Sequence, residues 1–280
     1  MVASSSETSW SGPSGLPVGD LPVEGPPSTD LAIPDSALAI GAHPDDIEFG
    51  CAATLAKWAR AGCRVHHLVL TDGSKGSWDP DRQLSDLAAE RRAECLAAAD
   101  IIDGAAGPGA GAGAGRDDRV IFLDRVDGEL EAGTDERRAV CRIIRAVRPS
   151  VILGHDPWRR YRLHPDHRAA GFLTIDALVA ARDPHFFPEL GLSPHRLDAL
   201  LLWEPDQPNH VEDVGGFEKD KIQALLCHLS QQKSTMGIDP TGARDAEAEV
   251  FATRVRHQLR AHGAVASVPV GEAFHLMTDL

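Results

Sequence analysis

The amino-acid sequence predicts an α/β fold in which helices flank a mainly parallel sheet, and two observations support this. From residue 36 onwards, short apolar runs alternate with longer segments whose apolar residues follow a helical pattern. Strands that alternate with helices form βαβ units, in which the strands run parallel and helices cover both faces of the sheet. The chain has 280 residues, enough for one large domain with a sizeable core. We therefore expect a single domain over residues 36–280.

The first βαβ unit is expected at the start of this domain. Ala37–Ala42 is a short apolar run and is predicted to be a buried strand. Phe49–Ala61 has a helical pattern and is followed by Gly62, a residue typical of helix ends. Arg64–Thr71 is rich in Val and Leu, which favours a second strand.

Two more helix–strand pairs follow. Leu84–Ala99 is predicted to be a helix, and Arg119–Leu123 the third strand. Asp135–Val147 is predicted to be a helix that stops before Pro149, because proline cannot continue a helix. Val151–Leu153 is then expected to be the fourth strand.

The last part of the chain has a weaker pattern. Asp166–Ala181 is expected to be a helix and Leu197–Trp203 a fifth strand. Helices are then expected near 216–232 and 244–262, before a final short segment at Ala273–Leu276. We expect this region to pack against the same core as a C-terminal appendage.

Two segments are expected to lie outside the regular elements. Residues 1–35 are predicted to be a disordered tail, since 16 of the first 30 residues are Ser, Pro or Gly. The run Gly107–Gly115, within an insertion at 104–117, contains part of the glycine pattern of dinucleotide-binding proteins. That pattern must lie between a strand and the next helix, whereas this run follows a helix and precedes a strand. It is therefore predicted to be a flexible surface insertion, which disfavours a nucleotide-binding or redox protein.

Composition excludes several classes of partner. The net charge of −14 argues against nucleic acids and anionic membranes, which attract proteins rich in Lys and Arg. No segment approaches the roughly 20 apolar residues of a membrane span, and no secretory signal is visible. The five cysteines are widely spaced without a Cys-x-x-Cys pair, which suggests reduced thiols in a cytoplasmic protein. Assembly into a homo-oligomer is left open.

Polar clusters follow three of the expected strands. His43 follows the first strand, Thr71-Asp72-Gly73 the second, and His155-Asp156-Pro157 the fourth. In open parallel sheets, ligands bind beyond the carboxyl ends of the strands, where the strand order switches. These three clusters should therefore lie at one edge of the sheet.

The triplet His-Pro-Asp occurs twice, which chance does not readily explain. It lies within Ala42–Glu48 (Ala-His-Pro-Asp-Asp-Ile-Glu) and begins His164–His167 (His-Pro-Asp-His). Each segment alone is also typical of a polar turn that caps a helix. Together at one sheet edge, their imidazoles and carboxylates suit a zinc site with an open coordination position. A carboxylate outside the ligand set could then serve as general base, and a spare histidine could stabilise an oxyanion. The pattern indicates hydrolysis of an amide or ester.

The motifs resemble those of a known family, the LmbE-like (PIG-L) zinc-dependent de-N-acetylases. The similarity runs in motif order from about Ala37 to Leu276, and its most specific parts are the two His-Pro-Asp segments. The supporting motifs are Thr71-Asp72-Gly73, Arg91-x-x-Glu94 and Glu272-Ala273-Phe274. The resemblance implies a Rossmann-like sheet and removal of an acetyl group from an N-acetylated amino sugar, typically an N-acetylglucosamine glycoside or conjugate.

The resemblance also implies a metal-ligand set. The zinc ligands would be His43, Asp46 and His167. Iron(II) or another divalent ion is an alternative for the same ligands.

The same resemblance implies catalytic and substrate-binding roles. Asp45 would be the general base, and His164, oriented by Asp166, would stabilise the oxyanion. Arg91 matches the family's substrate-binding arginine, although a solvated helix arginine is an equal alternative. Two further side chains could line a sugar subsite, Lys75 and Trp78.

The chain departs from the family pattern near the second motif. Some members carry a tyrosine two residues before its first histidine, where this chain has Arg162 with Tyr161 beside it. Two alternatives to the deacetylase remain: an amidase of thiol-sugar conjugates, and a metal-binding or sugar-binding protein without turnover. The presence of Asp45 argues against the second, because binding alone needs no carboxylate outside the ligand set.

Overall fold

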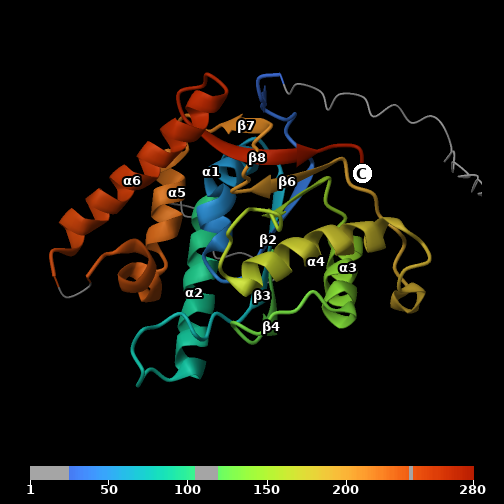
Figure 1. The fold of residues 1–280 in the computed structure, drawn as a ribbon, viewed down its shortest axis with the longest axis horizontal. Coiled ribbons are helices and arrows are strands. Elements are labelled where there is room, and N and C mark those ends of the chain that lie inside the picture. The colour runs from blue at the N-terminus through green and yellow to red at the C-terminus, as the bar shows by residue number, and fades with distance from the viewer. Residues whose placement is uncertain (1–24, 105–118, 240–241) are drawn as a thin grey trace, which may run out of the picture.

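Eight strands form one mixed sheet in the computed structural model of the protein, which describes residues 25–104, 119–239 and 242–280 (Figure 1). Along the chain these strands are β1 (Ser28–Thr29), β2 (Ser36–Gly41), β3 (Arg64–Thr71), β4 (Val120–Arg125), β5 (Val151–His155), β6 (Ala199–Trp203), β7 (His210–Asp213) and β8 (Gly271–Met277). Their order in the sheet is β1-β7-β8-β6-β5-β2-β3-β4. Strand β8 runs antiparallel to its neighbours β6 and β7, and all other neighbouring strands are parallel. The predicted α/β class with a mainly parallel sheet is confirmed.

Helices cover both faces of this sheet. They are α1 (Asp46–Arg60), α2 (Leu84–Ile102), α3 (Thr134–Val147), α4 (Pro165–Arg182), α5 (Glu218–Leu226) and α6 (Arg244–Val265). Side chains alternate along a strand, so Ala37 and Ala39 of β2 pack towards α1 and α2, while Leu38 and Ile40 pack towards α3 and α4. Helices α5 and α6 form a further apolar cluster beside α1 (Figure 1). None of the helices in the described ranges is long and apolar enough to cross a bilayer.

The strand order creates the switch point at which α/β proteins bind ligands. From β2 the chain proceeds outward to β3 and β4 on one side, and then returns through α3 to β5 on the other side of β2. The carboxyl ends of β2, β3 and β5 meet at one edge, because these strands are parallel neighbours. The expected convergence of the polar clusters that follow them is therefore confirmed.

The C-terminal region differs from the sequence-based expectation. It contributes β7 and β8 to the sheet itself, with β8 inserted between β7 and β6, instead of forming only an appendage. The sequence does not predict β7 because its residues His-Val-Glu-Asp are mostly polar; tertiary partners satisfy them, such as Lys57 for the Glu212 carboxylate. The single helix expected near 216–232 is α5 followed by two short turns, Leu229–Gln231 and Gln232–Met236.

The N-terminal boundary also differs. Ser28 and Thr29 of the expected tail pair with His210 and Val211 of β7, so regular structure begins before residue 36. Residues 1–24 lie outside the described residues, and the division into tail and domain stays a prediction. The insertion with Gly107–Gly115 also lies outside them.

Helix α1 is broken at Cys51, where φ is −151° and ψ is 18°. The break releases backbone groups from the helical pattern, and a buried ion pair binds them. The Glu272 carboxylate accepts the N–H groups of Ala53 and Thr54 at 3.2 and 2.8 Å. The ammonium of Lys221 donates to the Phe49 carbonyl at 2.7 Å and to Glu272 at 2.6 Å. Lys221 of α5 thus binds the first turn of α1, which lies at the switch point, and Glu272 of β8 binds the helix just beyond the break.

We expect Glu272→Ala to destabilise the protein by about 3–5 kcal/mol, because the Lys221 ammonium would be left buried without its partner. Denaturant unfolding followed by circular dichroism measures this. The control is Glu249→Ala, which removes one partner of the exposed pair with Arg256 and should change stability by less than about 1 kcal/mol. Equal effects of the two variants would contradict the structural role of the buried pair.

Candidate metal centre

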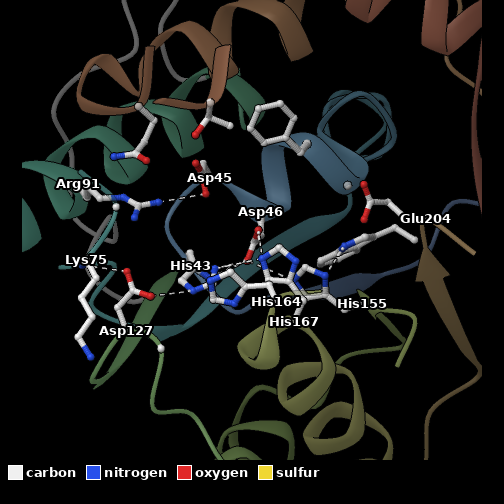
Figure 2. Close-up of a pocket in the computed structure, with 17 residues that line it drawn as sticks. His43, Asp45, Asp46, Lys75, Arg91, Asp127, His155, His164, His167 and Glu204 are labelled. Carbon is white, nitrogen blue, oxygen red and sulfur yellow. Dashed lines mark hydrogen bonds and ion pairs between the residues drawn. The ribbon is translucent and has the colours of Figure 1, made fainter. Parts of the chain in front are cut away.

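A cavity of about 470 Å³ lies at the switch point (Figure 2). Its walls include residues that end or follow five parallel strands, namely His43, Lys75, Asp127, His155 and Glu204. The first turn of α1, helix α2, the N-terminal turn of α4 and the segment after α5 also contribute, with Asp45, Asp46, Phe49, Gly50, Arg91, His164, His167, Gln231 and Thr235. Residues from both His-Pro-Asp segments therefore face one space.

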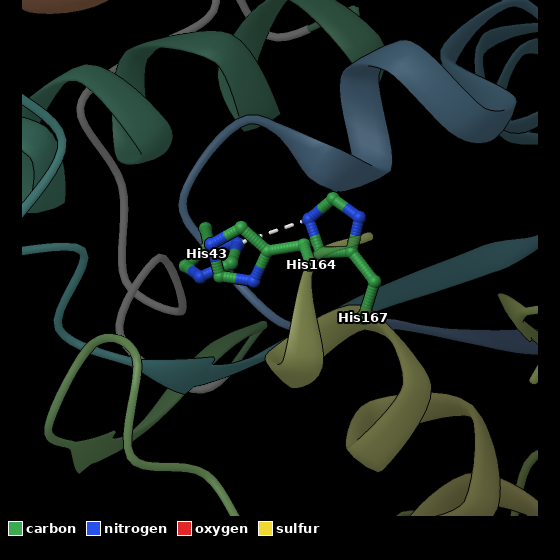
Figure 3. A group of neighbouring side chains, drawn as sticks. All are labelled: His43, His164 and His167. Carbon is green, nitrogen blue, oxygen red and sulfur yellow. Dashed lines mark hydrogen bonds between the residues drawn. The ribbon is translucent and has the colours of Figure 1, made fainter. Parts of the chain in front are cut away.

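Three donor groups converge at the floor of this cavity. Nδ1 of His43 lies 3.2 Å from Nε2 of His167, and 3.3 Å from Oδ2 of Asp46. Oδ1 of the same carboxylate lies 3.2 Å from Nε2 of His167. Figure 3 shows the two rings approaching each other from the two bends. Tetrahedral ligands at zinc–donor distances of 2.0–2.1 Å are separated by roughly 3.3 Å, so this spacing and the N₂O donor set fit a divalent metal such as zinc.

Other groups of donors in the described part of the chain also lie within 4.8 Å of one another: His43–His164–His167, Asp46–His155–His167 and His43–Asp127–Asp166. Hydrogen bonds show which ring nitrogen of His43 is available to a metal. Nε2 of His43 lies 3.2 Å from a carboxylate oxygen of both Asp127 and Asp166, which can only accept, so this nitrogen carries the proton. In the neutral ring, the form that binds a metal, Nδ1 is therefore the unprotonated nitrogen, and it faces Asp46 and His167.

Three carboxylates contact the His43 ring, those of Asp46, Asp127 and Asp166. Burial acts to lower its pKa, but hydrogen bonds with Asp127, Asp166 and Asp46 outweigh burial and raise the pKa well above its ordinary value. Such a concentration of negative charge in a buried place favours the binding of a cation.

Several groups fix the Asp46 carboxylate. Its Oδ2 accepts the backbone N–H of His43 at 2.7 Å and lies 3.2 Å from Nε2 of His155. Burial acts to raise the pKa of Asp46, but His167 and His155 outweigh it and hold the pKa well below its ordinary value. Burial, together with His167 and Arg162, lowers the pKa of His155 to about 4 although Asp46 opposes this, so His155 is neutral.

Asp45 belongs to the same bend but points to another side of the cavity (Figure 2). Its φ of 133° lies in the region that residues with a side chain rarely adopt, and such strain is typical of functional sites. One carboxylate oxygen lies 3.2 Å from Nη2 of Arg91. Burial raises the pKa of Asp45, partly opposed by Arg91. A buried carboxylate with a raised pKa, beside but outside the donor group, is suited to accept a proton.

Arg91 is itself buried in the wall. Besides Asp45, it donates to the carbonyls of Gly73 and Pro44, each at 2.8 Å. Gly73 has φ of +64°, and a Cβ there would come within 2.7 Å of the Arg91 guanidinium. The Thr71-Asp72-Gly73 motif therefore admits Arg91 to its place behind Asp45. Because Arg91 also lines the cavity, its assignment to substrate binding stays a prediction.

The second motif shows one difference from the implied roles. Nδ1 of His164 accepts a hydrogen bond from the backbone N–H of Asp166 at 3.2 Å, which leaves the proton of the neutral ring on Nε2. The resemblance implied that Asp166 orients His164, and the contact between them is made by the Asp166 backbone N–H and not by its carboxylate. The carboxylate contacts Nε2 of His43 and accepts the N–H groups of Gly128 and Leu130. A carboxylate without a donor would be costly when buried, so backbone donors hold it in this position.

The two side chains expected to line a sugar subsite, Lys75 and Trp78, lie in different surroundings. Lys75 lines the cavity, and its ammonium pairs with Glu129 at 2.8 Å. Trp78 does not line the cavity, and its side chain is 80% exposed. The sequence placed His155 at this edge of the sheet but gave it no role, and it did not single out Asp127, which follows β4 and also lines the cavity.

Comparisons with known proteins place this site in context. Residues 38–178 match the family model PIG-L, described as GlcNAc-PI de-N-acetylase. Diacetylchitobiose deacetylase of Thermococcus kodakarensis is 34% identical over 197 residues, which cover 69% of this chain and 69% of that protein. 1D-myo-inositol 2-acetamido-2-deoxy-α-D-glucopyranoside deacetylase of Streptomyces scabiei is 35% identical over 61% of this chain and 57% of its own length. The solved structure of N,N'-diacetylchitobiose deacetylase from Pyrococcus horikoshii superposes with a TM-score of 0.74 at 27% identity, covering 88% of this chain and 84% of that chain.

We expect His43→Ala and His167→Ala each to lower the affinity for Zn²⁺ by at least ~100-fold, since each removes a nitrogen that faces the Asp46 carboxylate. His164→Ala should leave the affinity close to that of the unmodified protein. Competition with a chromophoric chelator measures all three. A loss in His164→Ala as large as in His43→Ala would show that the three-histidine group holds the metal instead.

Proposed function

The chain belongs to the PIG-L family of de-N-acetylases, and from this membership we propose that it is a metal-dependent hydrolase that removes the acetyl group from an N-acetylated amino sugar of the N-acetylglucosamine type. One observation carries the proposal beyond family membership. Two imidazoles and a carboxylate meet around one point, while Asp45 of the same bend stays outside this group at the wall of the cavity. Metal-assisted amide hydrolysis needs this combination.

We propose that His43, Asp46 and His167 hold the cation, with zinc the ion that best suits two imidazoles and one carboxylate. A bound zinc ion would polarise the acetyl carbonyl and lower the pKa of water at the site. His43 keeps its Nδ1 available for this role because Asp127 and Asp166 hold the proton on Nε2.

Asp45 is the proposed general base. Its carboxylate takes a proton from the attacking water and returns it to the nitrogen of the leaving amine. Burial favours the protonated carboxyl, and the Arg91 guanidinium 3.2 Å away favours the carboxylate. The opposing effects suit a group that must gain and then release a proton within one turnover.

His164 is the proposed oxyanion donor. The backbone N–H of Asp166 binds its Nδ1, so the N–H at Nε2 is available to a group in the cavity. The ring lies beside His43, with ring centres 4.5 Å apart. A donor fixed at this place stabilises the negative charge that develops on the acetyl oxygen during attack.

Two further assignments belong to the proposal. Lys75 lies at the cavity wall, where its side chain can contact sugar hydroxyls. We also place the enzyme in the cytoplasm, because all five cysteines are free thiols and four of them are buried.

We expect Asp45→Asn to keep its bound zinc but to lose at least ~10²-fold in turnover, because an amide cannot accept the proton of the attacking water. Acetate release is followed with N,N'-diacetylchitobiose, the N-acetylglucosaminyl-inositol and its thiol S-conjugates as substrates, with metal content measured in parallel.

The matched control is Asp124→Asn, which changes an exposed carboxylate paired with Arg92 and should keep full activity. Unchanged turnover in Asp45→Asn would remove Asp45 as the base. No acetate release from any substrate by the zinc-loaded protein would contradict the proposed function.

A further inference from the structure

His155 is a buried histidine with contacts at both ring nitrogens. It is the last residue of β5 and is 2% exposed. One side of its ring faces the Asp46 carboxylate (Figure 2). The other side contacts Trp203 and Arg162. Its position at the cavity wall makes it either a metal ligand or a residue that holds one.

The partners of Nδ1 decide between these roles. The indole N–H of Trp203 donates to Nδ1 at 3.1 Å, and Nη1 of Arg162 lies 3.0 Å from the same atom. Indole and guanidinium groups can only donate, so Nδ1 has to be the acceptor and carries no proton. The single proton of the neutral ring is therefore on Nε2.

At Nε2 the Asp46 carboxylate is the acceptor, at 3.2 Å. The backbone N–H of Ala42 also points at Nε2, but from 3.4 Å, and a hydrogen bond to a charged oxygen is stronger than this longer contact between neutral groups. With Nδ1 occupied by two donors and Nε2 protonated, His155 has no lone pair to offer a cation.

We propose that His155 is a positioning residue for the metal ligand Asp46: its Nε2–H holds Oδ2 of that carboxylate, and Trp203 and Arg162 fix the tautomer that makes this possible. The proposal rests on the proposed function, in which Asp46 binds the cation. Oδ2 also accepts the His43 backbone N–H, so both donors hold the same oxygen and leave Oδ1 directed at His167. Donors of this kind set the orientation of a ligating carboxylate.

The groups behind His155 are fixed by their own contacts. Nη2 of Arg162 donates to Glu204 at 3.0 Å, which holds the guanidinium in place. Trp203 packs on Gly50 of α1, where an added Cβ would come within 2.5 Å of the indole ring. Arg162 lies two residues before His164, where some family members have tyrosine. It contacts Nδ1 of His155, on the side of the ring away from Asp46.

The test compares His155→Leu, which removes the donor, with His155→Gln, whose amide N–H can reach the position of Nε2. Zinc affinity is measured by competition with a chromophoric chelator, and circular dichroism checks the fold. We expect His155→Leu to bind zinc ~10–100-fold more weakly and His155→Gln to recover most of this loss. The control His275→Gln changes a histidine of β8 that contacts the Gln207 carbonyl and should bind zinc like the unmodified protein.

A second measurement needs no variant. Imidazole ¹⁵N spectra of the zinc-loaded protein should show His155 as a neutral ring with a protonated Nε2 and a bare Nδ1. A proton on Nδ1 with the metal on Nε2 would overturn the proposal, as would full zinc affinity in His155→Leu or an equal loss in His155→Gln.

These outcomes are separable from those of the deacetylase proposal. Zinc affinity that depends on the His155 donor in a protein that releases no acetate would leave this inference standing and remove the function. Acetate release by a protein whose zinc affinity does not change when His155 is replaced would support the function and contradict this inference.

Discussion

The burial of carboxylates around the two His-Pro-Asp segments is the physical constraint that shapes this site. Asp45, Asp46, Asp127 and Asp166 are each less than a tenth exposed, and such groups are costly to bury unless donors or cations compensate them. Each of the four carboxylates accepts hydrogen bonds from different donors. Arg91 donates to Asp45, and the His43 backbone N–H and the His155 ring donate to Asp46. The Lys75 backbone N–H donates to Asp127, and the backbone N–H groups of Gly128 and Leu130 donate to Asp166. Among these four carboxylates, Asp46 is the one that contacts the rings of both His43 and His167, which is why we propose that the metal binds there.

The fold meets this constraint by topology and by local distortions. Parallel neighbours β2 and β5 bring residues about 120 positions apart to the same edge, which no local interaction could do. The break in α1, bound by Glu272 and Lys221, gives the first turn of that helix a direction of its own. The positive φ at Asp45 then separates this side chain from Asp46, so that adjacent residues serve different purposes.

Much of the fold and of the candidate site could be predicted from the sequence, but not all of it. Strand β3 could be predicted with its observed bounds because Val and Leu dominate it, and the paired His-Pro-Asp segments could be predicted to meet because each follows a parallel strand. Strand β7 could not be predicted, since His210 and Glu212 look solvated until Ser28 and Lys57 supply their partners. His155 was visible at the edge, but its tautomer depends on donors that only the folded chain brings together. Trp78 was expected near a sugar because it follows β3, yet its loop leaves it exposed.

Anomalous diffraction at the zinc edge, from crystals of the zinc-loaded protein, would identify the metal ligands. We expect one strong peak bonded to Nδ1 of His43, a carboxylate oxygen of Asp46 and Nε2 of His167, with the Asp45 carboxylate outside bonding distance. A peak bonded to His155, or one bonded to Asp45 in place of Asp46, would contradict this ligand set.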